Sequence, residues 1–257
     1  ALNTITIGTI NVAVGAQALT ANTTGSSNNA FGYKALYANT IAVNNNAFGK
    51  ESLTANTTGN YNSAFGDRSL YTNTIGTANS AFGFYALRNN TTGIQNTAVG
   101  YAALQNNTVG GYNTAVGVVS LQFNTGSNNT AVGYGSLYAN TTGQKNAAFG
   151  NYALRNNTIG QQNSAFGTYT LRENTSGAAN VAFGNYSLRS NSIGNNNTAV
   201  GYQSLFSNVS GSNNSAFGMY TMKNNTSGIR NVAFGYGSSF SNLIGANNTA
   251  VGYLALY

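Results

Sequence analysis

Residues 129–145 read NTAVGYGSLYANTTGQK, and this 17-residue pattern recurs along the whole chain. The motif Ala-Val-Gly or Ala-Phe-Gly places one glycine in every repeat, fifteen times from Gly15 to Gly252. Successive motif glycines lie 17 residues apart, except for one step of 16 between Gly117 and Gly133. We number each repeat from its motif glycine, which is position 0. Because the repeat fills the chain, it decides the fold.

The repeat has the character of short strands rather than helices. It is too short for two helices and lacks an apolar stripe at helical spacing. Each half is an apolar stretch of four or five residues bounded by Asn and Gly, which is typical of strands between turns. We predict an all-β fold, a parallel β-roll or β-solenoid with one repeat per coil and about fifteen coils. Each coil would contain two short strands and two turns, and neighbouring coils would lie about 4.8 Å apart.

The chain shows no linker and no shift in composition. We therefore predict that residues 1–257 form a single repetitive β-roll domain. The repeat starts inside a coil, with Ile5–Gly8 in its second half, and stops at Leu256-Tyr257 without a polar cap. Because the end coils of a solenoid need caps, we expect a segment of a longer fibre, or a chain whose capping domains have been removed. The residue missing from the short repeat falls between Asn124 and Gly126, so we expect that deletion in a turn.

Two positions of the repeat are always Asn, at −4 in every copy and at +7 in every complete copy. Stacked coils would place each Asn against its own copy, so the amides can bond along the stack and to the turn backbone. Since a buried amide without partners is costly, we expect these residues to be structural. The predicted ladder includes Asn22, Asn28, Asn45, Asn56, Asn62, Asn113, Asn157 and Asn197.

Apolar residues form two further columns. Position −1 is always Val or Phe, and position +4 is Leu in all copies except Met222 and Ser239. Strand alternation directs Ala at −2 and Val or Phe at −1 to opposite faces. One apolar column can fill the roll, and the other would form a stripe longer than a monomer normally exposes. We therefore predict a parallel homo-oligomer with cyclic symmetry, and the alternative is a monomer with both columns partly internal.

Composition excludes several function classes. The 257 residues include no Cys and no His, so thiolate or imidazole metal sites and Ser-His-Asp triads are impossible. Only three acids are present, Glu51, Asp67 and Glu173. We expect no enzyme, no metal and no cofactor. The net charge of +7 rests on thirteen charged residues, ten basic and three acidic, and no apolar run approaches ~18 residues. We therefore expect neither a nucleic-acid partner nor membrane insertion.

The variable columns are the candidates for binding. Position +5 carries several cations, and tyrosines recur at +1 and +2. A guanidinium ladder flanked by Tyr suits an anionic partner such as a polyanionic glycan or lipopolysaccharide. The alternative is solubility, with rings stacked along the ladder and Arg over Tyr. The candidate binding residues are Arg88, Arg155, Arg172, Arg189, Lys223, Tyr152, Tyr169 and Tyr186.

Repeats such as residues 129–143 and 197–210 resemble two related groups of proteins. One is the head repeat of trimeric autotransporter adhesins, a trimeric parallel β-roll. The more similar group is the repeat of tail-fibre-like proteins from phages, giant viruses and bacteria, often found upstream of an intramolecular chaperone. This chain differs from the adhesin head in its longer coil and its recurrent Leu. The resemblance implies a trimeric fibre or adhesin segment and transfers no binding residue.

These observations together predict a structural or adhesive fibre segment, a trimeric shaft or head for attachment to a cell surface or host receptor. Its place would be extracellular, on a cell or virion surface. Two alternatives remain. A monomeric β-solenoid could bind polysaccharide, or ice through the threonines at +8 and +9, as at Thr57-Thr58. A self-assembling extracellular filament could form by end-to-end stacking of uncapped coils.

Overall fold

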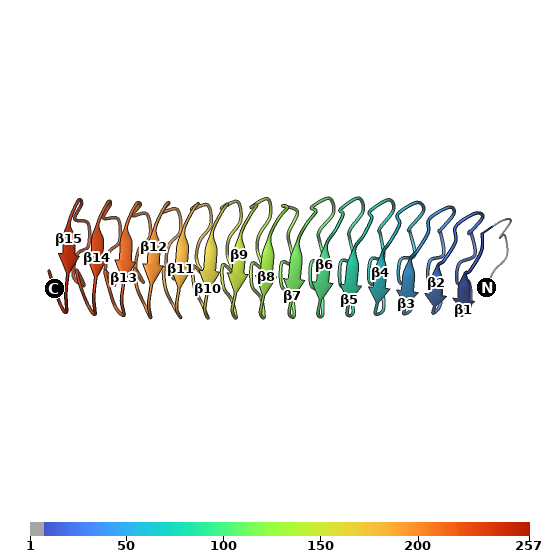
Figure 1. Cartoon of the computed structure of the whole chain (residues 1–257), viewed down its shortest axis with the longest axis horizontal. Coiled ribbons are helices and arrows are strands. Elements are labelled where there is room, and N and C mark those ends of the chain that lie inside the picture. The colour runs from blue at the N-terminus through green and yellow to red at the C-terminus, as the bar shows by residue number, and fades with distance from the viewer. Residues whose placement is uncertain (1–7) are drawn as a thin grey trace. The chain divides into compact units, whose positions relative to one another are not determined.

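A computed structural model of the chain describes residues 8–257, so the predicted start of the repeat at residues 5–7 lies outside the described residues. The chain forms two compact units, residues 1–128 and 129–257. The described part of unit 1 contains strands β1–β7, and unit 2 contains β8–β15 (Figure 1). Every strand has three residues and occupies positions −3 to −1 of its repeat.

The strands of unit 1 are β1 (Val12–Val14), β2 (Asn29–Phe31), β3 (Asn46–Phe48), β4 (Ser63–Phe65), β5 (Ser80–Phe82), β6 (Thr97–Val99) and β7 (Thr114–Val116). Those of unit 2 are β8 (Thr130–Val132), β9 (Ala147–Phe149), β10 (Ser164–Phe166), β11 (Val181–Phe183), β12 (Thr198–Val200), β13 (Ser215–Phe217), β14 (Val232–Phe234) and β15 (Thr249–Val251).

Within each unit, consecutive strands pair in parallel and in register. Phe31 pairs with Phe48 in unit 1, and Phe149 pairs with Phe166 in unit 2, so identical repeat positions lie side by side. This arrangement confirms the predicted all-β parallel solenoid with one 17-residue repeat per coil. It follows from sequence because a one-residue slip would turn the buried Ala column outward.

The prediction of a second strand in each coil is wrong. Positions +1 to +6 form turns in which the residues at +2 and +4 have positive φ, such as 56° at Tyr152 and 51° at Leu154. Backbone groups nevertheless pair from coil to coil: Tyr152 N–H donates to Tyr134 O at 2.9 Å, and Leu154 N–H donates to Thr170 O at 3.0 Å. The N–H groups of these turns thus donate to the preceding coil and to the following coil, although the backbone does not have β geometry.

This turn geometry has a packing consequence. Adjacent strand residues face opposite sides, whereas Ala153 and Leu154 are both fully buried. A left-handed conformation costs a non-glycine residue roughly 1–2 kcal/mol, and burying a leucine contributes roughly 1.5–3 kcal/mol. Burial of each leucine therefore offsets the strain of its own left-handed backbone.

The interior of each unit is narrow and half polar. Away from the end coils, Ala at −2, the small residue at +3, Leu at +4 and both Asn columns are buried, whereas Val or Phe at −1 is half-buried or exposed. The leucines therefore fill the coil interior and the Val/Phe column faces outward. At position 0 a side chain is excluded, because a Cβ on Gly167, whose φ is 134°, would lie 2.8 Å from the carbonyl carbon of Gly184.

The short repeat loses its residue in a turn, as predicted. Asn124 Nδ2 donates to Gly126 O at 2.8 Å, two residues away. In a full-length repeat the same bond spans three residues, as from Asn107 Nδ2 to Gly110 O. Strand β7, which precedes the deletion, keeps its three residues. The turn therefore absorbs the deletion.

Candidate binding surfaces

The asparagine at −4 connects three successive coils. Asn197 Nδ2 donates to Asn180 Oδ1 at 3.1 Å and to Gly211 O at 2.8 Å. Asn197 Oδ1 in turn accepts the backbone N–H of Asn214 at 3.0 Å. Asn28, Asn45, Asn62 and Asn113 occupy the same repeat position and are also fully buried. This column therefore supplies an acceptor to a buried backbone donor in each next coil.

The asparagine at +7 forms a second column. Asn157 Nδ2 donates to Asn140 Oδ1 at 2.7 Å and to Gly160 O at 3.0 Å, and Asn157 Oδ1 accepts from Asn174 Nδ2 at 2.7 Å. Asn22 and Asn56 are buried at the same position. Here the bonds along the stack join side chains to each other. Both columns are interior and carry no surface function.

The Val/Phe column at −1 is an exposed apolar stripe on the strand face of each unit, and we call it the Val/Phe stripe. In unit 1 it comprises Val14, Phe31, Phe48, Phe65, Phe82, Val99 and Val116, and in unit 2 Val132, Phe149, Phe166, Phe183, Val200, Phe217, Phe234 and Val251. Neighbouring rings stack almost in parallel, with centroids 4.6 Å apart for Phe31–Phe48 and 4.4 Å apart for Phe166–Phe183. Phe183 remains 47% exposed.

The predicted cation column lies against aromatic rings. The guanidinium carbon of Arg155 lies 5.3 Å from the Tyr138 ring centroid and 5.4 Å from that of Tyr152. Further cation–ring pairs are Arg88 with Tyr71 and Tyr85, Arg172 with Tyr169, Arg189 with Phe206, and Lys223 with Tyr220 and Phe240. Arg172 also pairs with Glu173 at 2.9 Å. These cations are half-buried, as expected if Arg lies over Tyr.

The candidate tyrosines of unit 2 stack on each other. Ring centroids of Tyr152–Tyr169 and of Tyr169–Tyr186 are 5.4 Å apart, with nearly parallel planes. Tyr134 meets one end of this stack at 86° and Tyr202 meets the other at 85°. The ring faces are thus occupied by other rings. This stretch does not offer the open faces on which a sugar could stack.

Sequence reasoning missed an ion pair in unit 1. Arg68 Nε donates to Glu51 Oε2 at 2.6 Å. This hydrogen bond lowers the pKa of Glu51 and raises that of Arg68. Both residues occupy position +2 in consecutive coils, so alignment of the repeats would have shown the opposite charges in contact.

A cavity of about 360 Å³ in unit 2 was also missed. It lies beside Gly237, the position +2 residue of its coil, and Tyr220, Tyr236 and Phe240 line it. The sequence signal was a glycine where many coils carry a large side chain.

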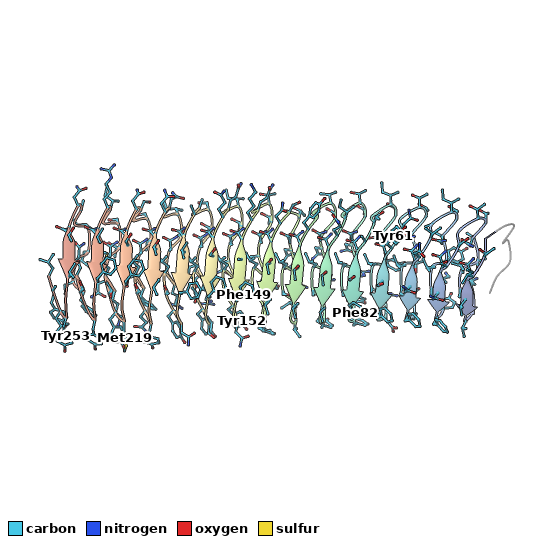
Figure 2. The ribbon with its side chains drawn as sticks, viewed as in Figure 1. Tyr61, Phe82, Phe149, Tyr152, Met219 and Tyr253 are labelled. Carbon is cyan, nitrogen blue, oxygen red and sulfur yellow. The ribbon has the colours of Figure 1, made fainter. Side chains whose placement is uncertain are left out.

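Figure 2 shows Tyr152, Met219 and Tyr253 of unit 2 along one edge of the coils; in unit 1, Tyr61 lies at an edge opposite Phe82.

The threonines at +8 direct their hydroxyl protons into the coil stack. Thr158 Oγ1 donates to Thr175 O at 3.0 Å, and Thr57 Oγ1 donates to Thr74 O at 3.1 Å. The neighbouring position +9 is exposed but mixed, with Ile159 at 54% exposure. The +8 hydroxyls therefore do not form an outward array of free donors.

No family model matches the chain, and no curated protein is significantly similar to it. Within residues 8–257, no three His, Cys, Asp or Glu side chains come together as a set of metal ligands. The same described range contains no helix that is long and apolar enough to span a membrane. The surfaces are therefore interpreted from their own geometry.

Proposed function

We propose that this chain is a segment of an extracellular attachment fibre on a cell or virion surface. In this proposal three copies associate in parallel and in register, and the fibre holds or presents a surface that binds a cell or host receptor. The chain has no role as an enzyme in this proposal. The observation that carries it is the Val/Phe stripe, which runs unbroken through the described coils of each unit.

The size of the stripe supports association between copies. A Phe side chain presents roughly 200 Å² when free, so Phe82 at 41% exposure and Phe183 at 47% each leave roughly 80–90 Å² of apolar surface, and the stripe of each unit adds up to a few hundred Å². Patches of that size are the largest that monomers usually expose, and they often mark interaction sites.

The form of the stripe favours a parallel, in-register assembly. It is a single file of residues at one repeat position, so copies related by a rotation axis along the coil stack place like coils against each other. An apolar axis shared by three copies would remove the stripe from water. The resemblance to trimeric fibre repeats favours three copies over two.

The direct test is the mass in solution by sedimentation equilibrium. We expect three times the 26.6 kDa chain mass at micromolar concentration. A monomer at all concentrations would refute the trimer, and a polymer without a limiting size would support the filament instead.

A matched pair of variants tests whether the stripe is the interface. Phe183→Thr removes roughly 90 Å² of exposed apolar surface, about 2 kcal/mol per chain. We expect it to shift the trimer towards monomer at low protein concentration. Ile159→Thr is the control, because Ile159 is 54% exposed at +9, where other repeats carry Thr. If Ile159→Thr dissociates the assembly and Phe183→Thr does not, the interface lies on the +9 column, and the Val/Phe stripe is refuted as the interface.

A further inference from the structure

The cavity beside Gly237 lies where a coil lacks a side chain at +2; the coil of Gly135 also lacks one, but there the Tyr152 ring lies 3.0 Å from where a Cβ would be. Five coils carry Tyr there, at Tyr85, Tyr152, Tyr169, Tyr186 and Tyr220. Gly237 has φ of 58°, within the range of those tyrosines, so its backbone does not demand glycine. A Cβ at Gly237 would meet the terminal Cδ2 of Leu254, a mobile group that can move aside. The backbone conformation therefore does not require glycine at this position. The missing side chain leaves space beside the column of +2 side chains.

Aromatic rings line this cavity. Tyr220 meets Tyr202 and Tyr236 at 76° and 81° rather than in a parallel stack, unlike Tyr169 with its two parallel partners. Phe240, at +5, lines the cavity together with Tyr236 and Tyr253. Beyond Gly237 the parallel stacking resumes, with Tyr236 on Tyr253 at 5.5 Å and Phe240 on Tyr257 at 5.3 Å. Tyr220 is therefore the lining ring without a parallel ring partner.

One positive charge faces the same cavity. Lys223 Nζ lies 4.9 Å from the Tyr220 ring centroid and 5.7 Å from that of Phe240, and Lys223 lines the cavity. No Asp or Glu is among the lining residues. The ammonium therefore lacks an acidic side-chain partner within the cavity and attracts an anionic group that enters it.

We infer that this cavity binds a carboxylated pyranose, such as a uronic acid residue of a surface glycan. The volume of about 360 Å³ suits a small ligand. The electron-rich face of Tyr220 attracts the C–H side of a pyranose, the hydroxyls of Tyr220 and Tyr236 can bond its hydroxyls, and Lys223 pairs with its carboxylate. This inference rests on the proposed attachment function, for which it supplies a receptor chemistry.

The test uses two probes that differ only in the carboxylate, methyl glucuronide and methyl glucoside, measured by saturation-transfer NMR on the full chain. We expect the glucuronide to bind about tenfold more tightly than the glucoside, because a hydrogen bond to a charged group is worth that much. Lys223→Gln should reduce glucuronide affinity to the level of the glucoside. Equal binding of both probes to the original chain would overturn the role of Lys223.

Gly237→Tyr closes the cavity while restoring the regular column. We expect it to abolish binding of both probes, and the folded chain should persist because Tyr occupies +2 in five other coils. Val119→Tyr, which adds a tyrosine at a half-buried +2 position in unit 1, is the control and should leave binding unchanged. Undiminished glucuronide binding by Gly237→Tyr would overturn the inference.

Sedimentation of the same samples separates the two proposals. Trimers that bind neither probe would overturn the cavity inference and leave the fibre proposal standing. Monomers that bind the glucuronide and lose it in Gly237→Tyr would refute the trimer and support the cavity.

Discussion

The two asparagine columns make different bonds, and this difference predicts different costs of mutation. Asn197→Ala and Asn208→Ala are a matched pair, because both side chains are fully buried and both donate to Gly211 O, at 2.8 Å and 3.0 Å. Only Asn197 accepts a backbone N–H, that of Asn214 at 3.0 Å.

The magnitudes follow from the bonds that each change removes. Asn197→Ala removes two bonds to Asn214, one to Asn180 and one to Gly211, and it leaves the rigid Asn214 N–H buried without that acceptor. At about 1 kcal/mol for each of the four bonds plus 1–3 kcal/mol for the orphaned donor, the loss is about 6 kcal/mol. Asn208→Ala removes three bonds and orphans no backbone donor in those contacts, so its loss is about 3 kcal/mol.

The assay is urea unfolding followed by tyrosine fluorescence, since the chain has 17 Tyr and no Trp. All samples need the same protomer concentration, because association would add to stability. Hydrogen exchange supplies a local readout, because coils of a solenoid depend mainly on their neighbours. We expect faster exchange at the Asn214 amide in Asn197→Ala but not in Asn208→Ala. Equal losses of stability, with unchanged exchange at Asn214, would refute the reasoning.

Two further predictions concern the interior and the ion pair. Leu188→Met should cost less than about 1.5 kcal/mol, because Met222 occupies the same column at the same φ, whereas Leu188→Ala should cost about 3 kcal/mol by leaving a cavity. Denaturant titration of both variants checks this, and equal costs would contradict it. The hydrogen bond from Arg68 lowers the pKa of Glu51 from 4.5, so its stabilisation is present above that pH and is lost as pH falls through the lower folded-state value. The pH dependence that this hydrogen bond gives to the melting temperature should therefore be lost in Glu51→Gln. An identical pH profile for Glu51→Gln and the original protein would contradict the prediction.

The sites were only partly predictable because stacking decides what a repeated residue contacts. The sequence assigns Arg172 and Tyr169 to outer columns. Only the folded structure shows that the faces of the Tyr169 ring are covered and that Arg172 pairs with Glu173. The Gly237 cavity depends on what its neighbours leave open. A glycine in a list of variable residues does not reveal that space.

The sequence by itself determined the parallel solenoid, the 17-residue coil and the positions of the asparagine columns. It could do so because fifteen copies show which residue types each position tolerates, and only stacked coils place every residue on its own copy. The tertiary structure decided that Leu faces inward and Phe outward, and that the second half of each coil is a turn with positive φ rather than a strand. A leucine rarely adopts that conformation in a short peptide. Coil-to-coil hydrogen bonds and burial of the leucine column select it, and both exist only once the coils are stacked.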